Sequence, residues 1–198
     1  MNVGIKLVLR RASQRGTGNG LKRYSSTLDD RYKQAMSGVA APANIITTIN
    51  GDEPRGLTVS SVTSLSVSPD PLVSFNIQIP SRTSQVLHRA NKFAVNILSG
   101  TAESVRLCKA FAGGYGAHVN PFDKFREEID FTGHNHGNIP VINHASAILF
   151  CQREHVFRTQ DHEIWIAKVY DVENNSSNGN LLYQNRSFHI LGKEIHDS

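Results

Sequence analysis

The chain has 198 residues, of which 39% are hydrophobic and 19% charged, proportions that are ordinary for one soluble globular domain with tails. It contains no run of about 18 apolar residues, which excludes a conventional membrane-spanning helix. Of the 21 basic residues, six lie in the acid-free stretch 1–24. The rest of the chain has 15 basic and 17 acidic residues, and this slightly acidic balance gives no electrostatic indication of nucleic-acid binding.

The first 24 residues have the composition of a mitochondrial transit peptide. Arg and Lys are interspersed with Val and Leu, and the acid-free stretch ends where Asp29 and Asp30 begin. We therefore expect residues 1–24 to direct the chain to the mitochondrial matrix and residues 25–198 to form the working domain. A disordered basic tail and a nucleic-acid-binding arm are the alternatives for the same segment.

Short strands dominate the pattern of the remaining chain. A helix over 29–37 comes first, with acids in its first turn and Gly38 as its terminator. The next two strands form a hairpin, because the residues between them, 50–52, have turn chemistry. Strands are predicted over 43–49, 56–62, 72–79, 93–98, 145–152, 155–159, 164–172, 181–183 and 187–191.

Helices interrupt these strands at two further places. One is predicted over 84–91 with Ser84 as its cap, and another runs from the cap Thr101 to Gly113. The irregular stretch 113–138 is long enough to favour a functional loop. Many short strands with helices only as inserts predict a mainly β fold, an antiparallel barrel or sandwich. Since no Gly-x-Gly-x-x-Gly or P-loop is present, a Rossmann dinucleotide domain is not expected.

Two hydroxyl-rich segments point to a ligand. Over 56–66, Thr58 and Ser60 alternate with apolar residues, as in a strand whose polar face looks into a site, and Ser61 follows. Where a later strand gives way to a helix, the segment Ser81-Arg82-Thr83 offers hydroxyls and a guanidinium suited to phosphate. Together they predict a pocket for a phosphorylated, hydrogen-bonding ring system, a description that flavin mononucleotide fits. The alternatives are a wet edge strand and a solvated turn with an exposed Arg.

Further candidate residues lie on the neighbouring elements. Asn76 and Gln78 point to the same side of one strand, because side chains alternate there. His162 follows Asp161 at the start of a strand, which could aim it at the mouth of a pocket. Phe111 and Ala112 end a helix that could approach the ligand. Packing in the core or exposure to water is the alternative for each of them.

Neither the cysteines nor the histidines form a set of metal ligands. Cys108 and Cys151 lie in apolar contexts without C-x-x-C spacing, so we expect buried thiols and no disulfide, in keeping with a reducing compartment. The pair His134 and His136 could be joined by other histidines, His118 and His144, but no nearby acid or Cys completes a ligand set. No metal is predicted.

The order of several short pieces resembles the flavin reductase-like family, whose fold is an FMN-binding split β-barrel of Greek-key type. The resemblance covers roughly 35–192 and marks 25–198 as one flavin reductase-like domain; with the basic start, it favours a fungal or other eukaryotic mitochondrial member. At Gln160 the chain departs from the family, which usually has Gly before the Asp-His pair. The matching pieces are 58–66, 71–75, 81–84, 93–98, 111–112, 139–140, 161–162 and 181–183.

The resemblance implies a homodimer with one flavin near each subunit interface and hydride transfer from NADH or NADPH to FMN, with FAD as the alternative flavin. His162 would lie near the nicotinamide, binding its carboxamide or supplying a proton. A flavin-dependent monooxygenase or another acceptor would take the electrons. The predicted flavin contacts are Thr58, Ser60, Ser61, Asn76, Gln78, Ser81, Arg82, Thr83, Phe111 and Ala112.

Three other functions remain open from the sequence. A flavin-binding electron carrier without reductase turnover would also fit. Gln160, in place of the Gly that is usual in the family, is the feature that favours it. An oxidase acting on a pyridoxine vitamer is expected to have several basic residues near the phosphate, whereas this segment has Arg82 alone. Nucleic-acid binding would depend on the basic segment 1–24.

Overall fold

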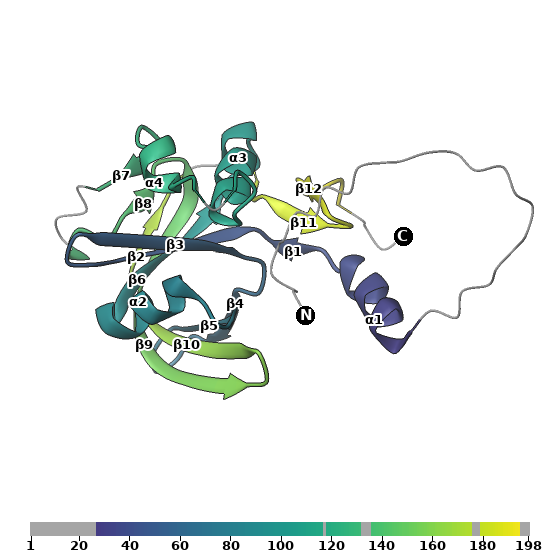
Figure 1. The fold of residues 1–198 in the computed structure, drawn as a ribbon, viewed down its shortest axis with the longest axis horizontal. Coiled ribbons are helices and arrows are strands. Elements are labelled where there is room, and N and C mark those ends of the chain that lie inside the picture. The colour runs from purple at the N-terminus through teal and green to yellow at the C-terminus, as the bar shows by residue number, and fades with distance from the viewer. Residues whose placement is uncertain (1–26, 117, 132–135, 176–178, 195–198) are drawn as a thin grey trace, which may run out of the picture.

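A single antiparallel sheet of seven strands organises the molecule. The computed structural model describes residues 27–116, 118–131, 136–175 and 179–194. The sheet has the order β3-β2-β6-β9-β10-β5-β4, and every neighbouring pair is antiparallel (Figure 1). The mainly β class predicted from the sequence is therefore confirmed. Its strands are β2 (Asn44–Asn50), β3 (Glu53–Val59), β4 (Thr63–Ser66), β5 (Leu72–Gln78), β6 (Lys92–Leu98), β9 (Ala145–Thr159) and β10 (His162–Asn174).

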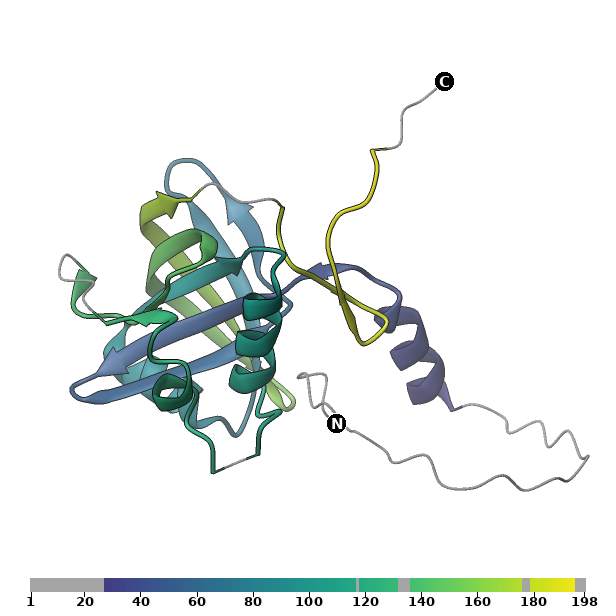
Figure 2. The ribbon, with the colours of Figure 1, turned by 90° about the horizontal axis from the view of Figure 1, so that it is seen from above.

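Helices and two small sheets surround these strands. Figures 1 and 2 both show α1 standing away from the main sheet, beyond β1. Among the described residues no helix is both long and apolar enough to span a membrane. The helices are α1 (Leu28–Ser37), α2 (Arg82–Ala90), α3 (Ala102–Phe111) and α4 (Pro121–Lys124). In one small sheet β11 (Leu182–Gln184) lies between β1 (Ala41–Pro42) and β12 (Ser187–His189), and in the other β7 (Ile129–Asp130) pairs with β8 (Val141–Ile142).

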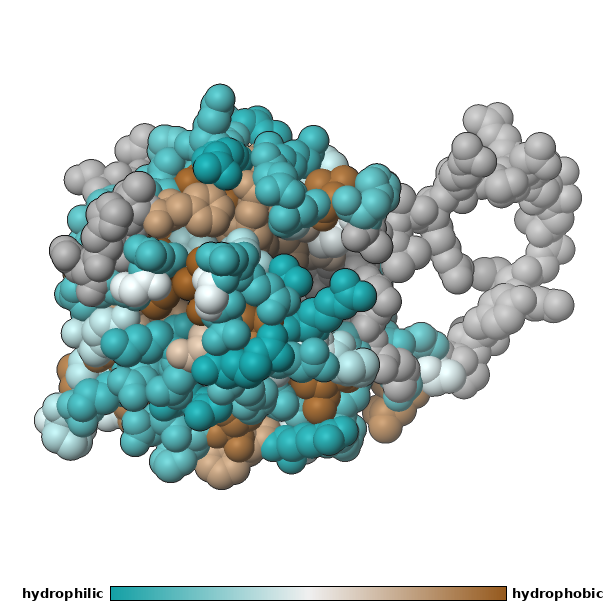
Figure 3. Space-filling view, turned by 60° about the vertical axis from the view of Figure 1, so that its left-hand side comes forward, coloured by the Kyte–Doolittle hydropathy of each residue, from teal (hydrophilic) through white to brown (hydrophobic). Residues whose placement is uncertain are grey.

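The core consists of two apolar clusters on opposite faces of the strands. Ile45 belongs to one and Ile46 to the other, because neighbouring side chains of a strand point to opposite faces. The β2 strand is thus buried on both faces from Asn44 to Thr48, and the buried hydroxyls of Thr47 and Thr48 donate to the carbonyls of Pro140 and Lys92. In the space-filling view of Figure 3, hydrophilic residues cover most of the face shown, with hydrophobic residues in small groups between them.

One predicted strand is wrong in its extent, and the difference lies at the edges of the sheet. The segment predicted as one strand over 56–62 belongs to β3 only as far as Val59, and β4 begins at Thr63. These two strands lie at opposite edges of the sheet, so the three residues from Ser60 to Val62 connect the edges. The sheet must curl for so short a link to span it, since about 3.3–3.6 Å per residue is the reach of an extended chain. The hydroxyl-rich segment therefore crosses the split between the edges.

Two other boundaries also differ from the predicted ones. The strands expected over 145–152 and 155–159 are one strand, β9, because its pairing with β10 shifts past Glu154 and then continues. The cap of α2 is Ser81 rather than Ser84, since the Ser81 hydroxyl accepts a hydrogen bond from the Ser84 amide at 3.2 Å. The loop 113–138 also holds α4 and β7.

Cys108 and Cys151 are free, buried thiols, as predicted. Burial raises the pKa of both thiols to about 12. Because the thiolate is the reactive form, we expect the folded chain to react with a disulfide reagent at pH 8 about 10³-fold more slowly than the unfolded chain. A colorimetric thiol assay with and without denaturant measures this ratio. Rapid modification of both thiols in the folded protein would contradict their burial.

Candidate functional site

The turn between β9 and β10 brings the predicted histidine to the end of the sheet. Gln160 and Asp161 are the two turn residues, and Thr159 pairs with His162 across the hairpin. Gln160 has a φ of 50°, a left-handed conformation that Gly adopts without the penalty of a side chain. Gln160 therefore keeps a left-handed backbone at the position where the resemblance leads one to expect Gly.

His162 shares one face of the sheet with two predicted flavin contacts. In the register between β10 and β5, His162 lies opposite Gln78 and Ile164 lies opposite Asn76. Since every second residue of a strand points the same way, these four side chains form one surface. Ile164 also pairs with Phe157 of β9, whose side chain extends the surface. We call these five residues the β5–β10 face.

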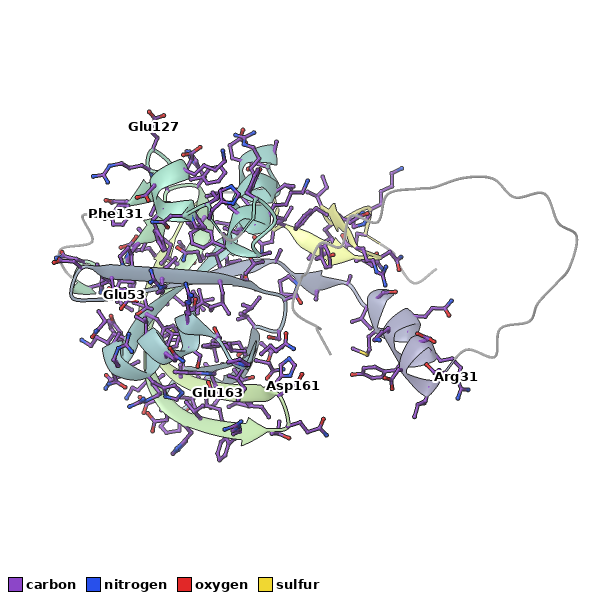
Figure 4. All side chains as sticks on the ribbon, viewed as in Figure 1. Arg31, Glu53, Glu127, Phe131, Asp161 and Glu163 are labelled. Atoms are coloured by element: carbon purple, nitrogen blue, oxygen red, sulfur yellow. The ribbon has the colours of Figure 1, made fainter. Side chains whose placement is uncertain are left out.

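Asp161 connects His162 to Gln78. The Nδ1 of His162 lies 2.8 Å from one carboxylate oxygen of Asp161, and the Gln78 amide donates to the other at 3.2 Å. The Asp161 carbonyl accepts from the Ile79 amide at 2.8 Å. Hydrogen bonds from His162 and then from Gln78 lower the pKa of the Asp161 carboxyl well below its usual value. Asp161, which Figure 4 labels, therefore stays ionised at neutral pH, and its two hydrogen bonds orient both side chains.

Replacing Asp161 by Asn tests this arrangement through the pH dependence of stability. A carboxyl whose pKa is lower in the folded state stabilises the fold above its unfolded pKa, near 3.9, and this contribution is lost as the pH falls through the folded pKa. We expect Asp161→Asn to be less stable than the wild type at pH 7 and the difference to shrink below about pH 4. Urea unfolding at pH 7, 5 and 3 measures it. A difference that does not change with pH would contradict an ionic role for Asp161.

The two hydroxyl-rich segments meet beside this face. The Ser61 hydroxyl accepts a hydrogen bond from the Asn76 amide at 2.9 Å, which fixes the link between the sheet edges against β5. The Thr83 hydroxyl donates to the Gly56 carbonyl at 3.1 Å, which fixes the start of α2 against β3. Ser60 lies half-buried in the link. The structure thus brings both segments and His162 to the same end of the sheet.

Arg82 occupies the first turn of α2 with its side chain exposed. Within the described part of the chain it makes no ion pair, whereas Arg89 at the other end of the helix pairs with Glu53 at 3.2 Å. The helix begins at the capping residue Ser81, and the first amides of a helix have no partner within it. A guanidinium beside a capped helix start is a suitable environment for a phosphate group.

Three predicted flavin contacts lie on the other side of β3. The buried Thr58 donates its hydroxyl hydrogen to the Cys108 carbonyl at 2.8 Å. The Phe111 ring is 7% exposed and packs against Phe122 with a centroid distance of 5.1 Å. A Cβ on Gly56 would lie 2.6 Å from this ring, so the glycine allows the close approach. Ala112 is the C-terminal cap of α3, the helix that ends at Phe111. In the described chain these side chains serve the fold, and their contact with flavin stays a prediction.

Histidines away from the β5–β10 face do not gather into a metal site in the described ranges, where no three potential ligands come together. The His136 ring stacks on Phe150 at a centroid distance of 3.6 Å, and its Nε2 lies 3.2 Å from Asp171. His134, the other member of the His-x-His pair, lies outside the described residues.

A polar cavity of about 310 Å³ lies elsewhere, between α1 and the β11–β12 turn. It contains none of the predicted site residues. Its lining consists of Asp30, Lys33, Gln34, Ser37, Asn185 and Arg186.

Two acidic residues at this end of the sheet are not among the residues predicted from the sequence. Asp161 was visible beside His162, and its position in a hairpin turn indicates its role. Glu163 gave no signal, because its carboxylate is held by residues of α2 that lie far away in the sequence.

The groups present at this end of the sheet fit a flavin nucleotide. Amide and hydroxyl groups of Asn76, Gln78 and Ser60 match the hydrogen-bonding edge of an isoalloxazine ring or its ribityl chain. The exposed cation of Arg82 matches the phosphate.

Comparison with known proteins identifies the family of the chain. The model of the flavin reductase like domain matches residues 36–192. A flavin reductase of Pseudomonas putida is 30% identical over 164 residues, which cover 80% of this chain and 88% of that protein. The NADH-dependent FMN reductase AsuE2 of Streptomyces nodosus subsp. asukaensis is 23% identical over 82% of this chain and 84% of its own length.

Solved structures show the same fold. Flavin reductase PheA2 in its native state superposes with a TM-score of 0.70 at 27% identity, covering 83% of this chain and 99% of that one. Since the family model spans most of the sequence and the fold agrees, the chain belongs to the flavin reductase-like domain family, with its split β-barrel fold.

Proposed function

We infer that the chain is a flavin reductase, an oxidoreductase that transfers hydride from NADH or NADPH to FMN, with FAD as an alternative. The observation that carries this inference is the convergence of His162, the hydroxyl-rich link and the start of α2 at one end of the barrel. Relatives named as NADH-dependent FMN and FAD reductases support the pair of nucleotides. A pyridoxine-vitamer oxidase is disfavoured by the family match.

The residues of the chain bind and orient the reactants. A flavin held there would supply the redox chemistry, as the acceptor of hydride from a reduced nicotinamide. Arg82 and the helix start of Ser81 and Thr83 would hold the phosphate, while Ser60, Ser61, Asn76 and Gln78 would hold the ribityl chain or the polar ring edge. Asp161 holds the Nδ1 side of His162, which leaves Nε2 to face the nicotinamide carboxamide or to deliver a proton. The protein accelerates the reaction by positioning.

Absorbance and turnover test this function directly. The purified full chain should bind added FMN and oxidise NADH or NADPH in its presence. A protein that binds flavin but oxidises neither nucleotide would be the electron carrier, and stopped-flow mixing with a reduced protein donor would identify it. Loss of flavin binding altogether would overturn both functions.

We propose that two copies of the chain associate through the β5–β10 face. Phe157 and Ile164 are 55% and 36% exposed, and they lie in register with Asn76. A second copy that covered them would border the flavin site. Light scattering should give a dimer mass for the wild type and a monomer for Phe157→Lys, whereas Tyr115→Lys, a change at an exposed aromatic residue outside the main sheet, should stay dimeric. A monomeric wild type would exclude the homodimer.

We propose that the reduced flavin serves a separate acceptor, such as a flavin-dependent monooxygenase. Relatives are named as reductase components of 4-hydroxyphenylacetate 3-monooxygenase and of 4-nitrophenol 4-monooxygenase. Release of reduced flavin into solution, trapped by cytochrome c, would support this role. Retention of the flavin through many turnovers would argue for direct transfer instead.

We also propose that residues 1–24, which lie outside the described residues, are a mitochondrial transit peptide of a fungal or other eukaryotic protein. Their basic, acid-free composition supports the proposal. Residues 1–24 fused to a fluorescent reporter should deliver it to the matrix of yeast mitochondria. Cytosolic fluorescence would count against the proposal.

A further inference from the structure

A half-hidden carboxylate joins α2 to the strand that carries His162. The side chain of Glu163 is 14% exposed. One of its oxygens accepts hydrogen bonds from the Ser84 hydroxyl and, at 3.1 Å, from the Trp165 indole. The other lies 3.2 Å from Nε2 of His88. Figure 4 labels Glu163 and Asp161 near the same end of β10.

The hydrogen bonds explain how a charge is tolerated there. Burial of a carboxylate is unfavourable unless donors replace water. Burial raises the pKa of Glu163, but the hydrogen bonds from Ser84, His88 and Trp165 outweigh it and lower the pKa below its usual value. Glu163 is therefore ionised at neutral pH, and its charge is directed at α2.

The contacts fix α2 at two points. Ser84 and His88 are four residues apart, so they lie on one face of the helix, one turn after the other. His88 is held in turn by Arg153 of β9, whose guanidinium donates to the His88 carbonyl at 3.0 Å. Arg82 lies two residues before Ser84, and His162 lies directly before Glu163. A movement of α2 along its axis would therefore separate the proposed phosphate contact from the proposed nicotinamide contact.

We propose that Glu163 is a positioning residue for the flavin phosphate: it holds the start of α2, and with it Arg82, at a fixed place relative to the hairpin that carries His162. This role rests on the proposed flavin reductase function. It predicts a selective defect, because only a flavin with a phosphate group uses the start of α2. Riboflavin has the same ring system and lacks the phosphate.

The test compares the KM for FMN with the KM for riboflavin in the full chain. Glu163→Ala should raise the KM for FMN about 10-fold or more and change that for riboflavin less than about 2-fold, since small displacements of a binding group are costly. Glu163→Gln keeps the shape and can still accept one hydrogen bond, so it should rescue part of the loss. Glu154→Gln is the matched control, because Glu154 is exposed on β9 and its side chain makes no ion pair or hydrogen bond with another described residue.

A second readout shows whether the cluster exists in solution. Trp165 is the only tryptophan of the chain, and its indole donates to Glu163. The emission of Trp165 should therefore shift in Glu163→Gln and remain unchanged in Glu154→Gln. The double variant Arg82→Ala/Glu163→Gln should be no worse for FMN than Arg82→Ala alone, because both changes act on the same contact.

The outcomes separate this inference from the proposed function. Equal losses for FMN and riboflavin, or losses of Arg82→Ala and Glu163→Gln that add fully, would overturn the positioning role while leaving the reductase intact. A wild type that reduces neither flavin would overturn the proposed function itself. Should Glu163→Ala fail to fold, Glu163→Gln decides the question, because it preserves the volume of the side chain.

Discussion

Replacing Arg82 by Ala is expected to raise the KM for FMN about 10- to 100-fold while leaving the KM for riboflavin within about 2-fold. Arg82 is exposed at the start of α2 and is not engaged in an ion pair with any described residue. Its guanidinium is thus available for a bidentate, charge-assisted contact with phosphate. Because the side chain is exposed, the free energy of unfolding should change by less than about 0.5 kcal/mol. Steady-state kinetics with both flavins measures the effect.

Arg89 provides the control for charge on the same helix. It lies in the last turn of α2 and forms an exposed ion pair with Glu53. Such pairs contribute about 0–1 kcal/mol to stability. Arg89→Ala should leave the KM for FMN unchanged. If Arg82→Ala behaves like Arg89→Ala, the phosphate does not bind at the start of α2.

Replacing Phe93 by Ala should have the largest effect on stability, a loss of about 3–5 kcal/mol in the free energy of unfolding. Phe93 is fully buried, and its ring contacts Phe75 at 5.5 Å and Trp165 at 6.2 Å between centroids, both in edge-to-face geometry. Removing it leaves a cavity at the centre of the cluster beneath α2. Urea unfolding followed by the fluorescence of Trp165 measures the loss.

Phe93→Leu is the companion variant. It conserves most of the volume, so its loss should stay below about 1.5 kcal/mol. Equal losses in the two variants would show that the aromatic geometry, rather than the filled volume, stabilises this cluster. Losses below about 1 kcal/mol in both would contradict the packing described for the site.

Local patterns of the chain predicted most of the elements, because their signals are short-range. Gly51 has a φ of 61° in the turn between β2 and β3, which agrees with the predicted hairpin. The burial of Cys108 and Cys151 was predictable because both have apolar neighbours in the sequence. Alternation along its strand made Gln78 a candidate, and its place at the start of a strand made His162 another; the register between β10 and β5 brings the two residues together.

Errors arose where long-range pairing decides the structure. The break expected after Gln152 is absent because β10 pairs with β9 on both sides of it, from Ala147 to Thr159, and accommodates Glu154 in a register shift. Ser84 had the composition of a cap, yet its hydroxyl bonds to Glu163, which is 79 residues away in the sequence. The alternation at Thr58 carried no signal of the hydrogen bond that its hydroxyl donates to the Cys108 carbonyl of α3, and its contact with flavin stays a prediction.

The sequence by itself determined the β-rich class, the positions of the turns and the presence of groups suited to a phosphorylated ring, because periodicity, capping and residue chemistry are properties of neighbouring residues. Only the tertiary structure decided which hydroxyls lie beside the β5–β10 face, as that of Ser61 does, and which point into the core, as that of Thr58 does. It also decided that Ser60 and Ser61 cross between the sheet edges, and that Glu163 fixes α2. These outcomes depend on the curl of the sheet and on contacts between residues far apart in the chain, for which a linear pattern carries no signal.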